Sequence, residues 1–141
     1  MDGLNMYNNW PQDIRDMQEK FGIQDWMKDP ANRDKLFEFL RFRMAFLQEE
    51  WEETNHAFAC ADPEELIDGH IDICVIAIGT LLAFGVDVEK AWDVVHKANM
   101  AKEVGTKPER PNPLGLPDLM KPEGWENPSH DGNHGNLTDN I

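Results

Sequence analysis

The sequence has little of what secreted, disulfide-linked or membrane-spanning proteins need. Its 141 residues include two cysteines, Cys60 and Cys74, which form no CxxC pair. We therefore expect no disulfide, a reducing cytoplasmic setting, and Cys74 in the core. No basic flank precedes an apolar stretch near the N-terminus, so no secretory signal is predicted. The longest apolar run, residues 71–84, contains Asp72 and is shorter than the ~20 residues that span a bilayer, so we predict a soluble protein without a membrane partner.

Positive charge is also scarce in this chain. The 13 Lys and Arg residues stand against 27 Asp and Glu residues, which gives a formal net charge of −14. A chain of this charge repels the phosphate backbone of nucleic acids, so no polynucleotide partner is expected. An acidic protein can still bind a phosphate substrate where metal ions reverse the local charge.

The sequence shows no alternating strand pattern and no internal repeat, and helical patterns dominate up to residue 104. Apolar residues at helical spacing predict four helices, at about residues 11–21, 32–57, 62–84 and 88–102. The third helix begins with Asp62 and Pro63, an N-cap and a first-turn proline, and Gly85 ends it. The expected fold is all-α, with a four-helix bundle domain formed by residues 1–104.

The chain changes character at residue 105. Prolines interrupt any helix in the segment that follows, at Pro108, Pro111, Pro113, Pro117, Pro122 and Pro128. Residues 129–141 are polar, and we expect them to be mobile. Residues 105–141 are thus expected to form an extended, proline-rich, irregular C-terminal tail that packs only in part on the helical domain.

Four carboxylates lie on helix stripes that are otherwise apolar. Glu50 and Glu53 lie on or beside the stripe of the second predicted helix, and Asp68 and Asp72 lie on the stripe of the third. The short connection between these two helices makes them antiparallel and brings the four acids to a similar height along the pair. The sequence therefore predicts that the four carboxylates point inward and face one another.

Carboxylates gathered in this way destabilise a fold unless a cation neutralises them. A divalent cation would do so, and ligation by oxygen alone favours Mg²⁺, or Mn²⁺ as a substitute, over zinc. The alternative is that the acidic run at residues 48–53 is a solvated helix face that binds no metal. Helical periodicity does not distinguish these two interpretations.

Several segments in a fixed order carry a family resemblance. They are Glu49-Glu50-Trp51-Glu52-Glu53, the run from Ile71 to Thr80, Ala83-Phe84-Gly85-Val86-Asp87, the run from Val95 to Lys102, and Lys121-Pro122-Glu123-Gly124-Trp125. Together they resemble the all-α nucleotide pyrophosphohydrolases, the superfamily that includes MazG, the dimeric dUTPases and phosphoribosyl-ATP pyrophosphohydrolase. The resemblance extends over nearly the whole chain to Trp125 and implies a MazG-like helical bundle.

The resemblance also implies a metal site, with one departure from the family pattern. The family carries Glu-Glu-x-x-Glu on one helix and Glu-x-x-Asp on the next. In the register of this sequence the Asp is Asp72, and the second Glu falls on Gly69. We expect Asp68, one residue away, to replace it, and Glu65 is the alternative. The predicted metal ligands are Glu50, Glu53, Asp68 and Asp72.

The function that the resemblance implies is hydrolysis of a nucleoside or deoxynucleoside triphosphate to the monophosphate and pyrophosphate. Glu49 or Glu50 would act as the catalytic base that accepts a proton from water. The predicted substrate-binding residues are His96, Asn99, Lys102, Lys121 and Trp125. The alternative for the first three is a polar surface stripe of the fourth helix, and Trp125 could serve only to pack the tail.

Two other functions stay open at this point. Phosphoribosyl-ATP pyrophosphohydrolase shares the fold and the ligands, whereas a non-catalytic helical adaptor would carry the same acids as plain surface. The helix predicted at residues 62–84 is apolar on more faces than one antiparallel partner can cover. We therefore also expect a homodimer or a dimer of dimers.

Overall fold

The structure, a computed structural model, describes residues 9–109 and 113–141. Its elements in chain order are α1 (Trp10–Lys20), α2 (Ile23–Lys28), the 3-10 helix η1 (Pro30–Lys35), α3 (Leu36–Ala59), α4 (Pro63–Ala83), α5 (Val88–Met100), β1 (Glu103–Gly105), β2 (Asp118–Met120) and the 3-10 helix η2 (Gly135–Leu137). The predicted all-α class is confirmed, and the four predicted helices correspond to α1, α3, α4 and α5. The sequence did not predict α2, nor the turn η1, which delays the start of α3 to Leu36.

The chain divides into two compact units. Of the described residues, the first unit contains those up to Val88 together with His134–Ile141, and the second contains those between Glu89 and Asn133. This division differs from the boundary expected at residue 105. Almost all of α5 groups with the segment that follows it, and the last eight residues group with the first unit.

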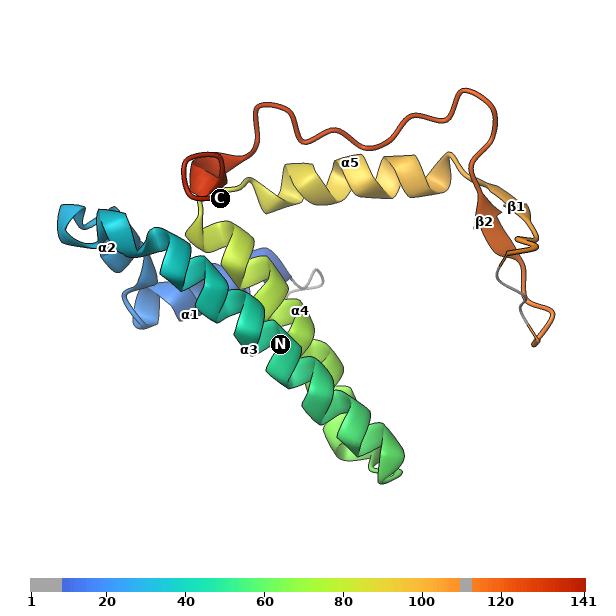
Figure 1. Cartoon of the computed structure of the whole chain (residues 1–141), viewed down its shortest axis with the longest axis horizontal. Coiled ribbons are helices and arrows are strands. Elements are labelled where there is room, and N and C mark those ends of the chain that lie inside the picture. Colours follow the sequence, from blue (N-terminus) through green and yellow to red (C-terminus); the bar gives the residue numbers. More distant parts are fainter. Residues whose placement is uncertain (1–8, 110–112) are drawn as a thin grey trace, which may run out of the picture. The chain divides into compact units, whose positions relative to one another are not determined.

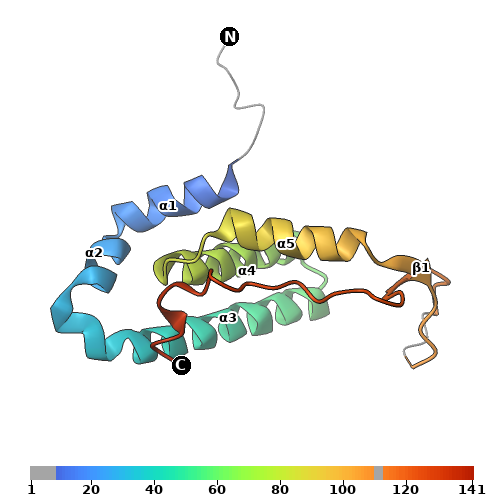
Figure 2. The same cartoon turned by 90° about the horizontal axis from the view of Figure 1, so that it is seen from above.

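The centre of the first unit is an antiparallel pair of long helices, α3 and α4, which lie side by side (Figure 1 and Figure 2). The chain reverses between them in a tight turn, in which Ala61 adopts a positive φ of 53°. The carboxylate of Asp62 caps α4 by accepting a hydrogen bond from the backbone N of Glu65, at 3.2 Å. Gly85, with a φ of 79°, ends α4 as the sequence predicted. Local sequence thus sets both ends of α4.

One end of the α3–α4 pair holds the apolar core of the first unit. Met27, Leu36, Ala83 and Phe84 form a buried cluster, and Phe84 is fully buried. Partly buried apolar side chains from α2, α3 and the C-terminal segment pack around it: Ile23, Trp26, Phe39, Leu40 and Leu137. The short helix α2 therefore closes this end of the pair.

Polar groups link α1, α3 and α4 near this core. Gln18 of α1 donates a hydrogen bond from Nε2 to the backbone O of Gly79, at 2.7 Å. Arg43 of α3 donates to Thr80 Oγ1 at 3.0 Å and to the backbone O of Ile76 at 3.1 Å. Partial burial lowers the pKa of Arg43 from its ordinary value. A Cβ at position 79 would lie 3.0 Å from both the Gln18 and Arg43 side chains, so glycine allows the three helices to meet here.

Residues 134–141 pack within the first unit, whereas the sequence predicted that residues 129–141 are mobile. The backbone N of Asn136 donates to the backbone O of Phe84 at 2.7 Å, and Leu137 packs against the buried cluster. Gly135 has a positive φ of 53°, and a Cβ there would overlap the Phe84 carbonyl. A backbone hydrogen bond and one apolar side chain thus hold a segment that is polar in composition.

The side of α4 that faces away from α3 is apolar and exposed within the first unit. Cys74 lies there, and it is exposed rather than in the core as predicted. Ile67 and Ile71 are also exposed on this helix. The prediction for Cys74 was wrong because an apolar run on a helix says nothing about which of its sides a neighbour covers.

By length and composition alone, α4 is long and apolar enough to cross a membrane, and no other helix of the described chain is. Core helices of soluble proteins meet the same criterion. Helix α4 shares two features with such core helices. It packs along α3, and its first half carries the acids Glu64, Glu65, Asp68 and Asp72.

The second unit consists of α5, a small sheet and the chain that returns along α5. Strands β1 and β2 pair antiparallel, with Glu103 opposite Met120 and Gly105 opposite Asp118. Each strand has three residues, too few for an alternating pattern to be visible in the sequence. After β2, residues 122–129 line a groove of about 600 Å³ together with one side of α5.

Candidate active site

Helix α3 carries three carboxylates close to one another, at Glu49, Glu50 and Glu53. Glu50 is half-buried, whereas Glu49 and Glu53 are exposed. Thr54 is buried, and its hydroxyl donates to the backbone O of Glu50 at 2.7 Å. Because Thr54 packs against Gly69 of α4, this part of α3 directs Glu50 toward the edge of the α3–α4 contact.

The charges that surround Glu50 come from both helices. The pKa of Glu50 is raised from its ordinary value, first by partial burial and then by the negative charges of Glu53, Asp72 and Glu49. Asp72 belongs to α4, so the structure brings one of the two predicted acids of α4 near Glu50. The metal site of four carboxylates stays a prediction. In the described part of the chain, no salt bridge reaches Glu50, Glu53 or Asp72.

These carboxylates line a solvated edge of the helix pair. Glu50 is half-buried, and Glu53, Asp68 and Asp72 are exposed, so the inward orientation expected for all four is not what the first unit shows. The physical reason is that two helices alone enclose little interior, and charges at their edge keep their hydration. A polar ligand can therefore reach all four side chains.

Gly69 explains the departure from the Glu-x-x-Asp pattern. It is buried against α3, and a Cβ at this position would overlap the side chain of Thr54. A glutamate has no room there, so any carboxylate that replaces it must come from a neighbouring position on α4. Asp68 and Glu65 are both exposed on that helix, but only Asp72 of α4 is close enough to raise the pKa of Glu50.

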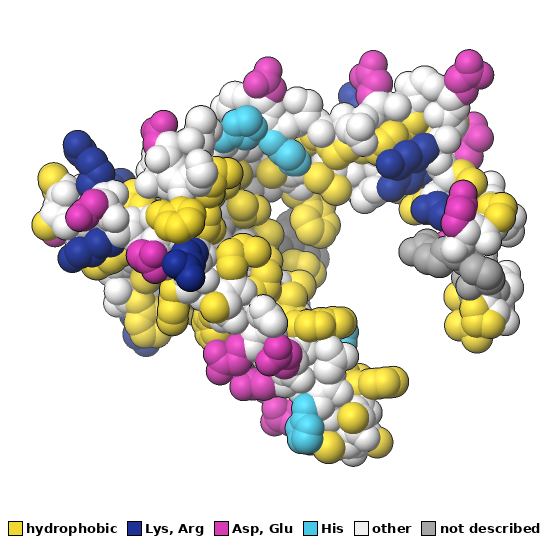
Figure 3. Space-filling model, in the orientation of Figure 1, with side chains coloured by type: hydrophobic (Ala, Val, Ile, Leu, Met, Phe, Trp, Pro, Cys, Tyr) yellow, Lys and Arg dark blue, Asp and Glu magenta, His cyan; other side chains and the backbone are white. Residues whose placement is uncertain are grey.

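A hollow of about 630 Å³ extends the acidic edge toward the turn between α3 and α4. Its lining comes from both helices and the turn: Glu49, Glu52, Glu53, His56, Ala57, Cys60, Asp62 and Glu65. Figure 3 shows acidic side chains gathered on this part of the pair beside a histidine. Glu65 lines the hollow and Asp68 does not, which favours Glu65 as a partner of Glu53. Sequence reasoning missed His56, although its spacing of three residues from Glu53 places it on the same side of α3.

The donor set fits a divalent cation by its chemistry. Every candidate ligand on this edge is a carboxylate, and oxygen-only ligation suits Mg²⁺ or Mn²⁺. Among the described residues, no group of three or more His, Cys, Asp and Glu side chains is arranged to hold a metal ion. Glu53, Asp68 and Asp72 are exposed, so their side chains are free to adopt other rotamers.

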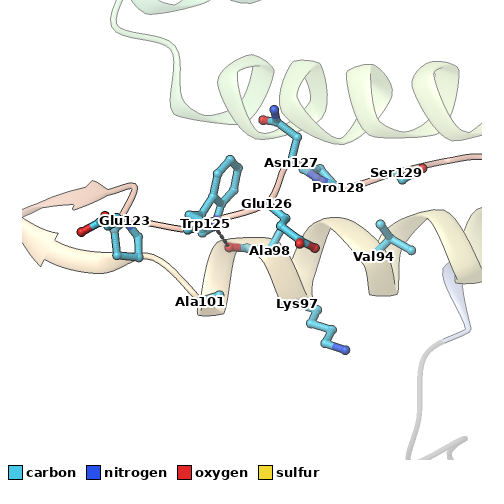
Figure 4. A pocket seen from close by; sticks show the side chains of 12 residues that line it. Val94, Lys97, Ala98, Ala101, Glu123, Trp125, Glu126, Asn127, Pro128 and Ser129 are labelled. Atoms are coloured by element: carbon cyan, nitrogen blue, oxygen red, sulfur yellow. Dashed lines mark hydrogen bonds between the residues drawn. The ribbon is translucent and has the colours of Figure 1, made fainter.

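Four of the five predicted substrate-binding residues gather in the second unit. Trp125 donates from Nε1 to the backbone O of Ala98 at 2.8 Å, and Figure 4 shows this hydrogen bond between the returning chain and α5. The ammonium groups of Lys102 and Lys121 lie 5.3 and 5.0 Å from the centre of the Trp125 ring, within the range of cation–π attraction. Lys102 also donates to Asn99 Oδ1 at 3.1 Å. Residues that are far apart in the sequence thus form one cationic cluster.

His96 is the fifth predicted residue, and it lies exposed on α5, one turn before Asn99. The hydrogen bond from Trp125 to α5 gives this tryptophan a packing role in the second unit, as the alternative interpretation expected. Packing and ligand contact do not exclude each other here, because Trp125 is only half-buried.

Comparison with known proteins identifies the family. The family described as Phosphoribosyl-ATP pyrophosphohydrolase matches residues 15–99, a segment that runs from α1 into α5 and includes every candidate acid. No curated protein matches the sequence. Members of the family are pyrophosphohydrolases that act on acid anhydrides, and they generally depend on divalent metal ions. Because the match covers more than half of the chain, this protein is an enzyme of the phosphoribosyl-ATP pyrophosphohydrolase family, within the all-α nucleotide pyrophosphohydrolase superfamily.

Proposed function

We propose that this enzyme hydrolyses nucleoside or deoxynucleoside triphosphates, in a Mg²⁺-dependent reaction, to the monophosphate and pyrophosphate. The observation that carries the proposal is the gathering of Glu50, Glu53 and Asp72 at one edge of the α3–α4 pair, with no described salt bridge to neutralise them. Family membership supports the choice of an enzyme over the helical adaptor that the sequence alone left open.

The metal ligands in this proposal are Glu50, Glu53 and Asp72, with a fourth carboxylate from Asp68 or Glu65. Mg²⁺, or Mn²⁺ in its place, would neutralise phosphate oxygens there and lower the pKa of an attacking water. Glu65 gains support from its place in the hollow beside Glu53, and Asp68 from its place one turn before Asp72. Exchanging each for its amide and measuring the affinity for Mn²⁺ would decide between them.

The proton of the attacking water goes to a carboxylate of α3. Glu49 is exposed and lies near enough to Glu50 to raise its pKa. If Glu50 holds metal, Glu49 is the better base, since a carboxylate that ligates a cation is a weaker proton acceptor. Glu49→Gln should then lower kcat and leave the affinity for Mn²⁺ nearly unchanged, whereas Glu50→Gln should lower both.

The cationic cluster of the second unit supplies the groups that phosphate requires. Lys102 and Lys121 bring two positive charges to one side of an otherwise acidic chain, and Asn99 adds an amide. We propose that these side chains, with His96, contact the phosphates or the base of the substrate. Lys121→Ala should raise KM more than it lowers kcat, because it removes a contact from ground state and transition state alike.

Product analysis tests the reaction itself. Incubation with a panel of NTPs and dNTPs and Mg²⁺, followed by ³¹P NMR, should show monophosphate and pyrophosphate in equal amounts. Diphosphate with orthophosphate would mean attack at the terminal phosphorus and would contradict the proposal. Glu53→Gln enzyme prepared in the same way serves as the control for contaminating phosphatases.

The family name gives the second candidate a specific basis, because phosphoribosyl-ATP is a nucleotide with the same type of bond. Cleavage of phosphoribosyl-ATP without cleavage of any NTP or dNTP would establish that activity in place of the proposed one. The acids on α3 and α4 would keep their roles in either case, since the bond that breaks is a phosphoanhydride in both.

We further propose that copies of this chain associate into a homodimer or a dimer of dimers. Exposed apolar side chains on α3 and α4, among them Trp51, Ile67 and Ile71, support self-association. The net charge of −14 supports an enzyme that binds neither nucleic acid nor anionic membrane. The two cysteines, which form no CxxC pair, support a cytoplasmic location. The mass of the wild-type protein in solution tests the association directly.

A further inference from the structure

A histidine and a cysteine are in contact where α3 ends. Cys60 Sγ lies 3.5 Å from His56 Nε2, and the spacing of four residues places both on one side of the helix end. Both side chains are exposed, and Cys60 forms no disulfide. They line the acidic hollow, but neither is among the proposed metal ligands or catalytic bases. The proposed reaction therefore gives this pair no role.

The separation of the two atoms fits coordination of one tetrahedral ion. Zn²⁺ bonds to thiolate sulfur at about 2.3 Å and to imidazole nitrogen at about 2.0–2.1 Å. At the tetrahedral angle these bonds place sulfur and nitrogen about 3.5 Å apart, and Cys60 Sγ and His56 Nε2 have that separation. A hydrogen bond that involves a thiol is weak, so little stability is lost when an ion replaces it.

The charges around the pair favour a cation. Apart from His56, Ala57 and Cys60, every residue that lines the hollow is an acid: Glu49, Glu52, Glu53, Asp62 and Glu65. No salt bridge of the described chain reaches these five carboxylates. Negative charges gathered in one hollow attract a divalent ion and repel anions.

The ligand atoms determine which cation binds. Thiolate sulfur and imidazole nitrogen suit Zn²⁺ and its transition-metal neighbours, whereas carboxylate oxygen suits Mg²⁺. The acidic edge at Glu50, Glu53 and Asp72 offers only oxygen, and the end of α3 adds sulfur and nitrogen. The two places therefore differ in the ion that they select, although Glu53 belongs to the first and also lines the hollow of the second.

We propose that His56 and Cys60 bind one Zn²⁺ ion at a site separate from the Mg²⁺ edge, and that this ion inhibits hydrolysis. His56 binds through Nε2, and Cys60 binds as the thiolate after its proton has gone to solvent. A carboxylate of the hollow and water complete the ligand set. The bound charge lies in the hollow that Glu53 also lines, where it repels the catalytic metal. Inhibition rests on the proposed function, whereas binding of Zn²⁺ does not.

A second histidine–cysteine pair with the same spacing lies on α4 and lacks these features. His70 and Cys74 are both exposed, and neither lines the acidic hollow. Nδ1 of His70 lies 2.7 Å from the backbone O of Leu66. This hydrogen bond holds the ring toward the preceding turn of α4, whereas Cys74 lies on the following turn. Cys74 therefore provides the matched control for Cys60.

Cobalt binding tests the site directly. Co²⁺ takes the place of Zn²⁺ and, unlike Zn²⁺, gives a thiolate-to-metal absorption band. With Mg²⁺ in excess to occupy the acidic edge, the reduced wild-type protein and Cys74→Ser should both show this band, and Zn²⁺ should abolish it. Cys60→Ser should lack the band, and His56→Asn should bind Co²⁺ at least about tenfold more weakly. Far-UV circular dichroism confirms that the variants fold.

Three outcomes of the cobalt titration would overturn the metal site. They are a wild-type protein without the band, a band that survives Cys60→Ser, and a band that Cys74→Ser alone removes. In the first case the contact between His56 and Cys60 is only a hydrogen bond at the surface of α3. In the last case the ion binds on α4 instead.

A Zn²⁺ titration of the ³¹P NMR product assay tests inhibition. With Mg²⁺ alone, Cys60→Ser should turn over substrate at the wild-type rate. It should need at least about tenfold more Zn²⁺ than the wild-type protein for the same inhibition. Equal sensitivity would mean that Zn²⁺ acts at the acidic edge and would overturn inhibition from this site. A protein that hydrolyses no nucleotide but shows the Cys60-dependent band would contradict the proposed function and its inhibition, and would establish the metal site by itself.

Discussion

The two halves of the α3–α4 pair differ in whether their polar side chains have bonding partners. In the half that contains Leu36–Phe46 of α3 and Ile76–Ala83 of α4, here called the closed half, buried polar side chains have partners. Arg43 bonds to Thr80 and to the backbone of Ile76, and Gln18 of α1 bonds to the backbone of Gly79. In the other half, here called the open half, Glu50, Glu53 and Asp72 repel one another and no described salt bridge reaches them.

This difference separates stability from function along a single pair of helices. The closed half gathers the apolar cluster around Phe84 and satisfies its polar groups, which is how buried groups contribute to stability. The open half keeps mutually repelling carboxylates, which lower stability unless a ligand neutralises them. Substitutions in the open half should therefore change activity more than stability, and those in the closed half should do the reverse.

The largest effect is expected from Glu53→Gln in the open half. Loss of one metal ligand removes several kcal/mol of charge stabilisation in the transition state, so kcat should fall by at least about a thousandfold. The rise in melting temperature that Mg²⁺ gives the wild-type protein should also shrink. Steady-state kinetics and thermal unfolding with and without Mg²⁺ measure both effects.

The matched control for Glu53→Gln is Glu64→Gln. Glu64 is exposed on α4 and does not line the acidic hollow, so its amide variant should keep both the activity and the response to Mg²⁺. Equal losses in the two variants would place the metal site elsewhere. They would also contradict the conclusion that the open half serves activity.

In the closed half, Arg43→Met should be the most damaging change to stability. It removes two hydrogen bonds from a charged, half-buried group, and bonds of this kind contribute roughly 1.5–3 kcal/mol. Thr80 still donates to the backbone O of Ile76 at 2.7 Å, so part of the network remains. We expect a loss of about 2–3 kcal/mol in the free energy of unfolding, measured by urea denaturation.

The control for this change is Arg33→Met, because Arg33 is exposed in η1. Its substitution should change the free energy of unfolding by less than about 0.5 kcal/mol, as is usual for surface positions. The effect of Mg²⁺ on melting should be the same in both variants. A changed metal response in Arg43→Met would show that the two halves are not independent.

Gly69→Ala tests the contact that lies between the acids of the open half. The added Cβ would overlap the Thr54 side chain and separate α3 from α4, and overpacking of this kind costs about 1–3 kcal/mol. The double variant with Thr54→Ala should lose less stability than the sum of the two single variants, since Thr54 is the obstacle. Simple additivity, measured by urea denaturation, would mean that these residues do not meet.

The helices and the meeting of acids from α3 and α4 could be predicted from the sequence because their signals are local. The ends of α4 are set by Asp62, Pro63 and Gly85, whose capping effects do not depend on what the helix packs against. Helical periodicity and a short turn were enough to bring Glu50 near Asp72. The sequence could not show that Gly69 lies against Thr54, because that requires the rotation of each helix about its axis.

The missed features depend on contacts between residues distant in the chain. Leu137 packs into a cluster formed mainly by α2, α3 and α4. Its neighbours in the sequence are polar, so they do not indicate that it packs against this cluster. Trp125 bonds to Ala98, which lies 27 residues away, so its anchoring could not be read from the tail alone. The exposure of Cys74 was missed because apolar composition does not reveal which faces of a helix are covered.

The smallest effect, and the one with the opposite sign, is expected from Glu50→Gln. The negative charges of Glu53, Asp72 and Glu49 all act on Glu50. Replacing Glu50 with the neutral Gln therefore removes electrostatic repulsion that is present in the folded protein when no metal is bound. Because the neighbours are largely exposed and screened by solvent, the gain in stability should stay below about 1 kcal/mol. In EDTA the variant should therefore melt slightly above the wild-type protein, and in excess Mg²⁺ below it, since it no longer binds the cation as tightly. A crossover of this kind requires a carboxylate whose charge opposes folding and favours metal binding. A variant that melts below the wild-type protein in both conditions would mean that Glu50 stabilises the fold by itself. The charged side chain would then contribute to stability, as the polar side chains of the closed half do.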